Sequence, residues 1–226
     1  MSNKPLIFSL LCTLALTVLG LWMWISLPEA EQYPIHWNAA GEADGFAGRN
    51  AVLGVLMIMP ITQTFMTALL YFIPKIEPLR QNFEESRAAY NWVWVGLMAF
   101  LTLTGIMNAM MYHGGGSKTL GEATIMTMAI GTSLLLIGIG NVMGKIRQNF
   151  MFGIRTPWTL SSDLSWEKTH RIGGRLFVGA GLIGVILAFI NPLTSILVTI
   201  ALILLTVLIC VIYSYKVWKS DPNKRS

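Results

Sequence analysis

The chain has 226 residues, of which 54% are hydrophobic and only 12% are charged, and its mean hydropathy is +0.60. A soluble domain of this length would carry about 25% charged residues, so the composition excludes an ordinary soluble protein. The net charge of +5 is explained by the orientation of a membrane protein, derived below, and requires no nucleic-acid partner.

Six apolar stretches near 20 residues long recur along the chain, the length that a helix needs to cross a hydrocarbon core about 30 Å thick. The sequence therefore predicts an all-α integral membrane protein, a bundle of six transmembrane helices. The first stretch is longer than the apolar part of a signal peptide and no Ala-x-Ala site follows, so we expect a retained helix. The spans are expected at Leu6–Leu27, Ala51–Ile73, Tyr90–Tyr112, Leu120–Met143, Ile172–Ile190 and Leu193–Tyr213.

Basic residues predict the orientation of these spans, because cytoplasmic connections are enriched in Lys and Arg. With the N-terminus inside, the outer connections contain only Arg49 and Lys118 of the 16 basic residues. The other fourteen lie in inner segments. Both termini are therefore predicted to face the cytoplasm.

The first outer connection, Pro28–Asn50, is long enough to have a function of its own. Tyr33–Trp37 is expected to form a short strand, and Asn38–Gly41 and Asp44-Gly45 have the composition of turns. The loop carries a net charge of −3. Two interpretations stay open: a small outward recognition element, or an interfacial cap whose aromatic residues lie at the membrane boundary. His36 lies among acids without a ligand spacing typical of a metal site, so no metal or cofactor is predicted.

The middle helices carry few polar groups. Asn108 and Asn141 are expected to face neighbouring helices, and the Gly140-x-x-x-Gly144 pattern predicts a close helix approach. No Asp, Glu, Lys or His falls in the middle of a span. Since proton-coupled transporters usually carry such groups at membrane depth, the sequence disfavours transport.

The inner segment 145–175 is the most polar part of the later chain. Gly153–Pro157 is a predicted turn in which Pro157 makes Thr156 extended. Ser161, Ser162 and Asp163 are candidate N-caps of the next helix. The apolar run Leu176–Ile190 covers only about 23 Å, so the fifth helix must begin earlier than this run.

From Asp163, acids and bases follow at four-residue spacing: Glu167, then Arg171 and Arg175. This order suits both ion pairing and the helix dipole. His170 with Asp163 and a serine suggests a triad, but no nucleophile elbow is present. We therefore predict no enzymatic activity. The inner arginines could bind lipid phosphates or an acidic peptide, or follow only from the positive-inside rule.

Several strings in this segment resemble the SdpI family of bacterial membrane proteins. They are Gly140-Asn141, Asn149, Gly153-Ile-Arg-Thr-Pro-Trp-Thr-Leu160, and Trp166-x-x-Thr-His-Arg171 followed by Gly173-Gly174. The outer string Pro34-Ile-His-Trp-Asn-Ala-Ala-Gly41 with Asp44-Gly45 resembles the associated DUF1648 region. The resemblance implies a DUF1648-like region at 1–89, with inner loop 74–89, and an SdpI-like region at 90–226.

The resemblance also implies the functional residues. The inner partner-binding set comprises Asn141, Asn149, Gly153, Arg155, Thr156, Pro157, Trp158, Thr159, Trp166, Thr169, His170 and Arg171. The outer recognition set comprises Pro34, His36, Trp37, Gly41 and Asp44.

The family's best-known activity is immunity to a secreted toxin peptide, with sequestration of a repressor at the membrane. The resemblance therefore implies a multi-pass immunity or signalling protein of the bacterial cytoplasmic membrane, whose partners are membrane lipids, a toxin peptide outside and a transcriptional repressor inside. It implies no direct contact with nucleic acid. The alternative is a small lipid- or solute-handling transporter that uses the inner arginines.

Overall fold

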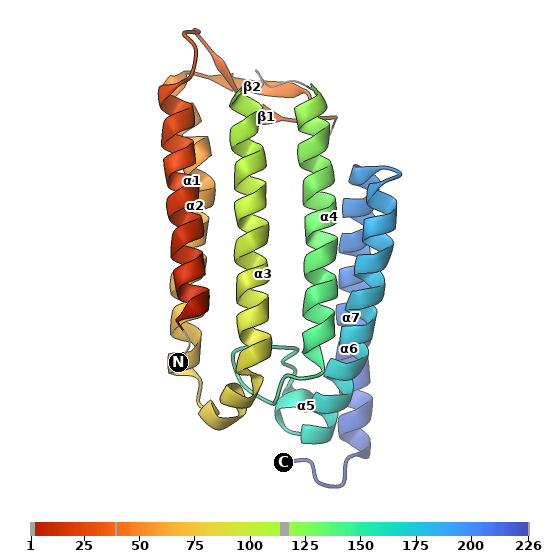
Figure 1. The fold of residues 1–226 in the computed structure, drawn as a ribbon. Coiled ribbons are helices and arrows are strands. Elements are labelled where there is room, and N and C mark those ends of the chain that lie inside the picture. The colour runs from red at the N-terminus through yellow and green to blue at the C-terminus, as the bar shows by residue number, and fades with distance from the viewer. Residues whose placement is uncertain (1–2, 39, 114–117, 226) are drawn as a thin grey trace. The chain divides into compact units, whose positions relative to one another are not determined.

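The computed structural model describes residues 3–38, 40–113 and 118–225 and is mainly helical (Figure 1). Six of its helices are long and apolar enough to cross a membrane, which confirms the predicted fold class. These are α1 (Lys4–Ile25), α2 (Arg49–Ile76), α3 (Arg80–His113), α4 (Lys118–Met143), α6 (Asp163–Ala188) and α7 (Pro192–Ser220). A short helix, α5 (Pro157–Leu160), and two strands, β1 (Tyr33–Trp37) and β2 (Ala43–Ala47), complete the described chain.

Most helices extend beyond the apolar runs that predicted them. α3 starts at Arg80 and α7 continues to Ser220, since polar residues at a membrane boundary can continue a helix into water. The fifth spanning helix begins at Asp163, as its short apolar run required. Its N-cap is Ser162, whose Oγ accepts the Ser165 N–H at 2.9 Å.

The chain divides into two compact units. The first comprises Met1–Leu69 and Leu97–Gly131, and the second comprises Leu70–Gly96 and Thr132–Ser226. The buried core of the first unit joins α1, β1, α2 and α3 through Met23, Leu27, Tyr33, Val52, Leu56, Ala109 and Tyr112.

The connection between α1 and α2, in the first unit, folds into an antiparallel β-hairpin. The predicted strand Tyr33–Trp37 is confirmed, but the predicted turn at Asp44-Gly45 is wrong, because both residues lie within β2. The chain reverses earlier, where Asn38 Oδ1 accepts the N–H groups of Ala40 and Glu42 at 2.9 and 3.1 Å. Gly45 is needed for another reason: a Cβ there would lie 2.9 Å from the His36 Cβ.

Close helix packing in the second unit depends on small residues. α6 packs along α7 and contacts α5. Gly140 of α4 meets Gly174 of α6 so closely that a Cβ at either one would lie 2.5–2.6 Å from the other's carbonyl oxygen. A Cβ at Gly144 would meet nothing within 4 Å. The Gly-x-x-x-Gly pattern therefore contributes only its first glycine to the close approach.

Candidate functional site

The connection between α4 and α6 folds around α5. Gly153 has φ +119°, a conformation that favours glycine. Thr156 is extended, with φ −110° and ψ 161°, as the following proline requires. The Thr156 N–H donates to Thr159 Oγ1 at 2.9 Å, and the Thr159 N–H donates to Thr156 Oγ1 at 3.1 Å. The string Arg155-Thr-Pro-Trp-Thr159 is therefore the start of a reciprocally capped helix.

Trp166 and His170 form the buried centre of the connection. Their rings stack with centroids 4.0 Å apart, and the two residues are 3% and 1% exposed. The Trp166 Nε1–H donates to the Ile146 carbonyl at 2.7 Å. His170 Nδ1 donates to the Trp166 carbonyl at 2.8 Å, and His170 Nε2 accepts the Ile154 N–H at 2.9 Å. The imidazole is therefore neutral with both nitrogens engaged, so it holds the loop and is not free to act as a base.

Two amide side chains organise the first part of the connection. The Asn149 Oδ1 accepts the N–H groups of Met151 and Phe152 at 3.0 and 2.6 Å. The Gln148 Nε2 donates to the Thr159 carbonyl at 2.7 Å and so ties the loop to α5. Asn149 was among the predicted residues; Gln148, which is 6% exposed, was not.

Glu77 is the most informative residue that the sequence did not reveal. It follows α2, is 1% exposed, and its carboxylate accepts the Leu79 N–H at 2.9 Å. The same carboxylate accepts the Phe150 N–H at 3.1–3.2 Å. The α2–α3 connection is thereby joined to the connection between α4 and α6. Glu77 is a single acidic residue before Pro78 and belongs to no sequence motif, so the sequence alone could not identify its role.

The charged residues of the site form a shell of ion pairs. Arg147 pairs with Glu85 at 3.1 Å and Arg171 with Glu167 at 2.6 Å. Asp163 pairs with Arg225 at 2.8 Å. Of the predicted Asp163–Arg175 series, only the Glu167–Arg171 step forms as an ion pair among the described contacts.

Arg155 is exposed and donates to the Phe150 carbonyl. Arg175 is also exposed. The inner arginines thus do not converge on one anion pocket.

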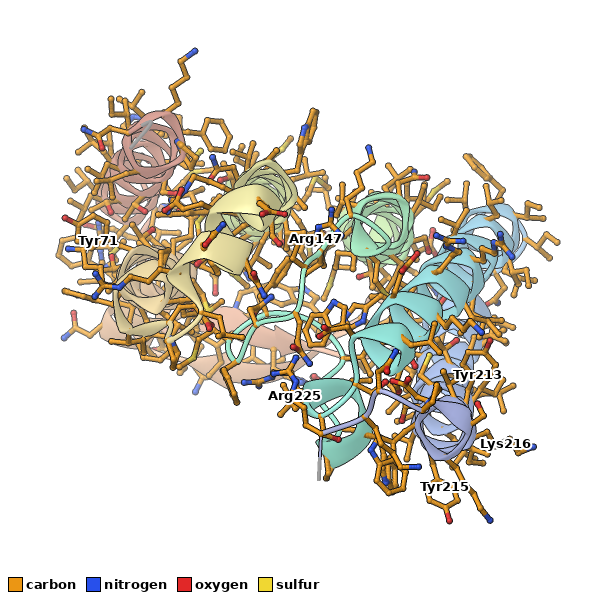
Figure 2. All side chains as sticks on the ribbon, turned by 90° about the horizontal axis from the view of Figure 1, so that it is seen from below. Tyr71, Arg147, Tyr213, Tyr215, Lys216 and Arg225 are labelled. Atoms are coloured by element: carbon orange, nitrogen blue, oxygen red, sulfur yellow. The ribbon has the colours of Figure 1, made fainter. Side chains whose placement is uncertain are left out.

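A polar cavity of about 610 Å³ opens beside these pairs. It is lined by Asn82, Glu85, Gly144, Lys145, Ile146, Arg147, Gln148, Asp163, Trp166 and Glu167. Figure 2 labels Arg147, on the connection after α4, and Arg225, on the tail after α7. The cavity offers both carboxylates and basic groups to a partner. Among the described residues, no group of three or more His, Cys, Asp and Glu is placed to hold a metal ion.

Three further residues of the predicted inner set, Asn141, Trp158 and Thr169, do not line this cavity. Trp158, next to Pro157, packs on Tyr215 with ring centroids 5.1 Å apart. Thr169 is fully buried and its Oγ1 has no hydrogen-bond partner. Asn141 is exposed on the last turn of α4, so the expectation that it faces a neighbouring helix is wrong.

The predicted outer residues all lie on or beside the hairpin of the first unit. His36 and Asp44 form an exposed pair at 2.5 Å, and Trp37 packs edge-on against Tyr112 with centroids 5.7 Å apart. Pro34 lies opposite Phe46 in the register. Gly41, with φ +75°, allows the turn to contact the backbone at Gly121.

A neighbouring ion pair joins Glu42 to Lys118 at 3.1 Å. The hydrogen bond from Lys118 lowers the pKa of Glu42. The hairpin therefore has two acidic residues, Asp44 and Glu42, each paired with a basic residue, together with an exposed Phe46.

Comparison with known proteins supports the resemblance seen in the sequence. Residues 145–214 match the SdpI/YfhL protein family, and residues 11–61 match a domain of unknown function, DUF1648. The chain is 25% identical over 219 residues to the Immunity protein SdpI of Bacillus subtilis (strain 168), covering 96% of each protein. No solved structure matches. This chain is thus a multi-pass membrane protein similar over nearly its whole length to an immunity protein.

Proposed function

We propose that this protein is a non-enzymatic immunity protein of a bacterial cytoplasmic membrane. It protects its cell from a secreted toxin peptide and relays the presence of that peptide to a cytoplasmic repressor. The observation that carries the proposal is the similarity to an immunity protein over 96% of both chains.

The chemistry of the inner site favours binding over catalysis. Its one histidine has both ring nitrogens engaged, and its buried amides and hydroxyls hold backbone groups of the loop. Such satisfied networks fix a surface in one shape. The groups that remain available to bind a partner are those of the charged cavity and the exposed side chains of Arg155 and Phe150.

The hairpin supplies the matching outer element in this proposal. The basic-residue count assigns it to the outer side, where its net negative charge would attract a cationic peptide. The exposed side chains His36 and Phe46 are the groups that we expect the peptide to contact. α2 begins two residues after β2 and ends directly before Glu77, so one continuous helix leads from the recognition element to the inner site.

The test is complementation of a strain that lacks the gene, challenged with secreted peptide toxins. We expect wild type and Lys168→Ala to restore survival, because Lys168 is exposed in the same inner segment. Phe46→Ala should reduce survival, because it changes the proposed binding surface for the peptide. Arg155→Ala should abolish the toxin-dependent expression of a reporter gene that the repressor controls. If re-expression leaves toxin sensitivity unchanged, the immunity proposal fails.

The same variants address the alternative of a transporter. Purified protein in liposomes would then move a lipid or solute, and Arg155→Ala would stop that flux while Lys168→Ala would not. Flux with this dependence would replace the immunity proposal.

A further inference from the structure

The segment Asp221–Arg225, which follows α7, returns to the inner site and holds two of its parts together. In Figure 1 it leaves the end of α7 and runs back towards α5. We refer to these five residues as the C-terminal latch. Its two ends make contacts of very different kinds.

One end of the latch is buried. Asp221 is 5% exposed, and its carboxylate accepts the Ser162 hydroxyl at 2.5 Å and the Asn223 N–H at 2.9 Å. The Asp221 N–H also closes α7 by donating to the Trp218 carbonyl at 3.1 Å. Buried, charge-assisted hydrogen bonds of this kind are strong, so Asp221 is the fixed end.

The other end is exposed and bridges two walls of the cavity. Arg225 Nη2 donates to Gln148 Oε1 at 2.9 Å and to Asp163 Oδ1 at 2.8 Å. The Arg225 N–H donates to the Ser161 carbonyl at 2.8 Å. Gln148 belongs to the connection after α4, whereas Asp163 opens α6, so a single guanidinium joins both lining segments.

These contacts make the Arg225 end releasable. The side chains of Arg225 and Asp163 are 60% and 79% exposed, and an exposed ion pair is weak and screened by salt. Between the two ends, residues 222–224 are exposed and form no helix or strand. Release of Arg225 therefore requires only the loss of this ion pair and of its hydrogen bonds to Gln148 and the Ser161 carbonyl, while Asp221 stays in place.

We propose that the C-terminal latch is a conformational switch of the inner cavity. With Arg225 docked, the connection after α4 and the start of α6 are held together and Asp163 is occupied. With Arg225 released, Gln148 Oε1 and Asp163 Oδ1 become free to accept hydrogen bonds from a partner. The switch deepens the proposed function by giving its inner site a closed and an open state, but it does not depend on what the cavity binds.

The test measures hydrogen–deuterium exchange of residues 144–156 in the full chain. The protein is held in nanodiscs of uncharged phosphatidylcholine, so that anionic lipid does not compete for the latch. Arg225→Ala should speed exchange there by about threefold to tenfold, the factor expected from losing an exposed ion pair and a hydrogen bond. Lys224→Ala is the matched control, because its ammonium donates to the Lys219 carbonyl instead, and we expect less than about a twofold change.

Salt and a second variant separate a switch from simple destabilisation. Raising ionic strength from about 0.01 to about 1 M shortens the screening length roughly tenfold; it should speed exchange in wild type but not in Arg225→Ala. Asp163→Asn should behave like Arg225→Ala, and the double variant should be no faster than either. If Arg225→Ala is unstable, Asp163→Asn with its salt series gives the answer.

Unchanged exchange in both variants, additive effects in the double variant, or an equal salt effect in Arg225→Ala would each overturn the latch. Because no toxin is used, a failure here is distinct from a failure of the immunity proposal.

Discussion

The close backbone contact between Gly140 of α4 and Gly174 of α6 allows the packing of the second unit to be tested by a single substitution. In Gly140→Ala, the new Cβ would lie 2.5 Å from the Gly174 carbonyl oxygen and 2.9 Å from the Val178 backbone nitrogen. Both atoms are backbone of α6, so no side chain can move aside. α4 and α6 must separate, or their contact must shift along the helices.

The size of the effect follows from two opposing contributions. Overpacking of this kind costs about 1–3 kcal/mol, while alanine in place of glycine within a helix gains about 0.5–1 kcal/mol. We expect a net loss of about 0–2.5 kcal/mol, which corresponds to a midpoint lowered by about 0–10 °C for a chain of this size.

Thermal unfolding in detergent, followed by tryptophan fluorescence, measures this loss. Gly138→Ala is the matched control, because it lies in the same helix and its Cβ would meet nothing within 4 Å. We expect the control to be unchanged or slightly stabilised. If Gly140→Ala unfolds at the same temperature as Gly138→Ala or higher, the close α4–α6 contact does not exist as described.

Three further predictions concern the site around α5. Glu77→Ala should lower stability by about 1–3 kcal/mol, because it leaves the partly buried N–H groups of Leu79 and Phe150 without their acceptor. Glu77→Gln should cost less, and thermal unfolding should rank the two. Trp166→Ala should lower the free energy of unfolding by about 3–5 kcal/mol, because the ring is buried. Arg155→Ala should change it by no more than about 0.5 kcal/mol, because the side chain is exposed. The amount of protein in the membrane, compared by immunoblot, should therefore fall only for Trp166→Ala. The Ser162 hydroxyl and the Asn223 N–H lower the pKa of Asp221 below its ordinary value of 3.8, so its stabilising contribution is present at neutral pH and is lost as the pH falls through that lowered pKa. Asp221→Asn should thus be less stable than wild type at pH 7, with a difference that shrinks on acidification; a difference that stays constant would contradict this linkage.

Local patterns in the sequence predicted the features that depend on neighbouring residues. Apolar length fixed the six helices, Pro157 required an extended Thr156, and Ser162 was a candidate cap for the helix that it does cap. The turn at Asp44-Gly45 was the exception. Its composition fitted a turn, but the hydrogen bonds of Asn38 form the hairpin turn earlier in the chain. Asp44 and Gly45 therefore lie within the second strand.

The pairings between distant residues came only from the tertiary structure. Nothing in the sequence shows that Glu77 accepts the Phe150 N–H, that Gly140 meets Gly174, or that both nitrogens of His170 are engaged. Asp163 had an acid–base series on its own helix, yet it pairs with Arg225 from the tail. Sequence determined which segments are helical and which are polar, because hydrophobicity and capping act within a few residues. Which polar groups satisfy one another was decided by packing, because burial leaves each of them only the partners that the fold brings within hydrogen-bond reach.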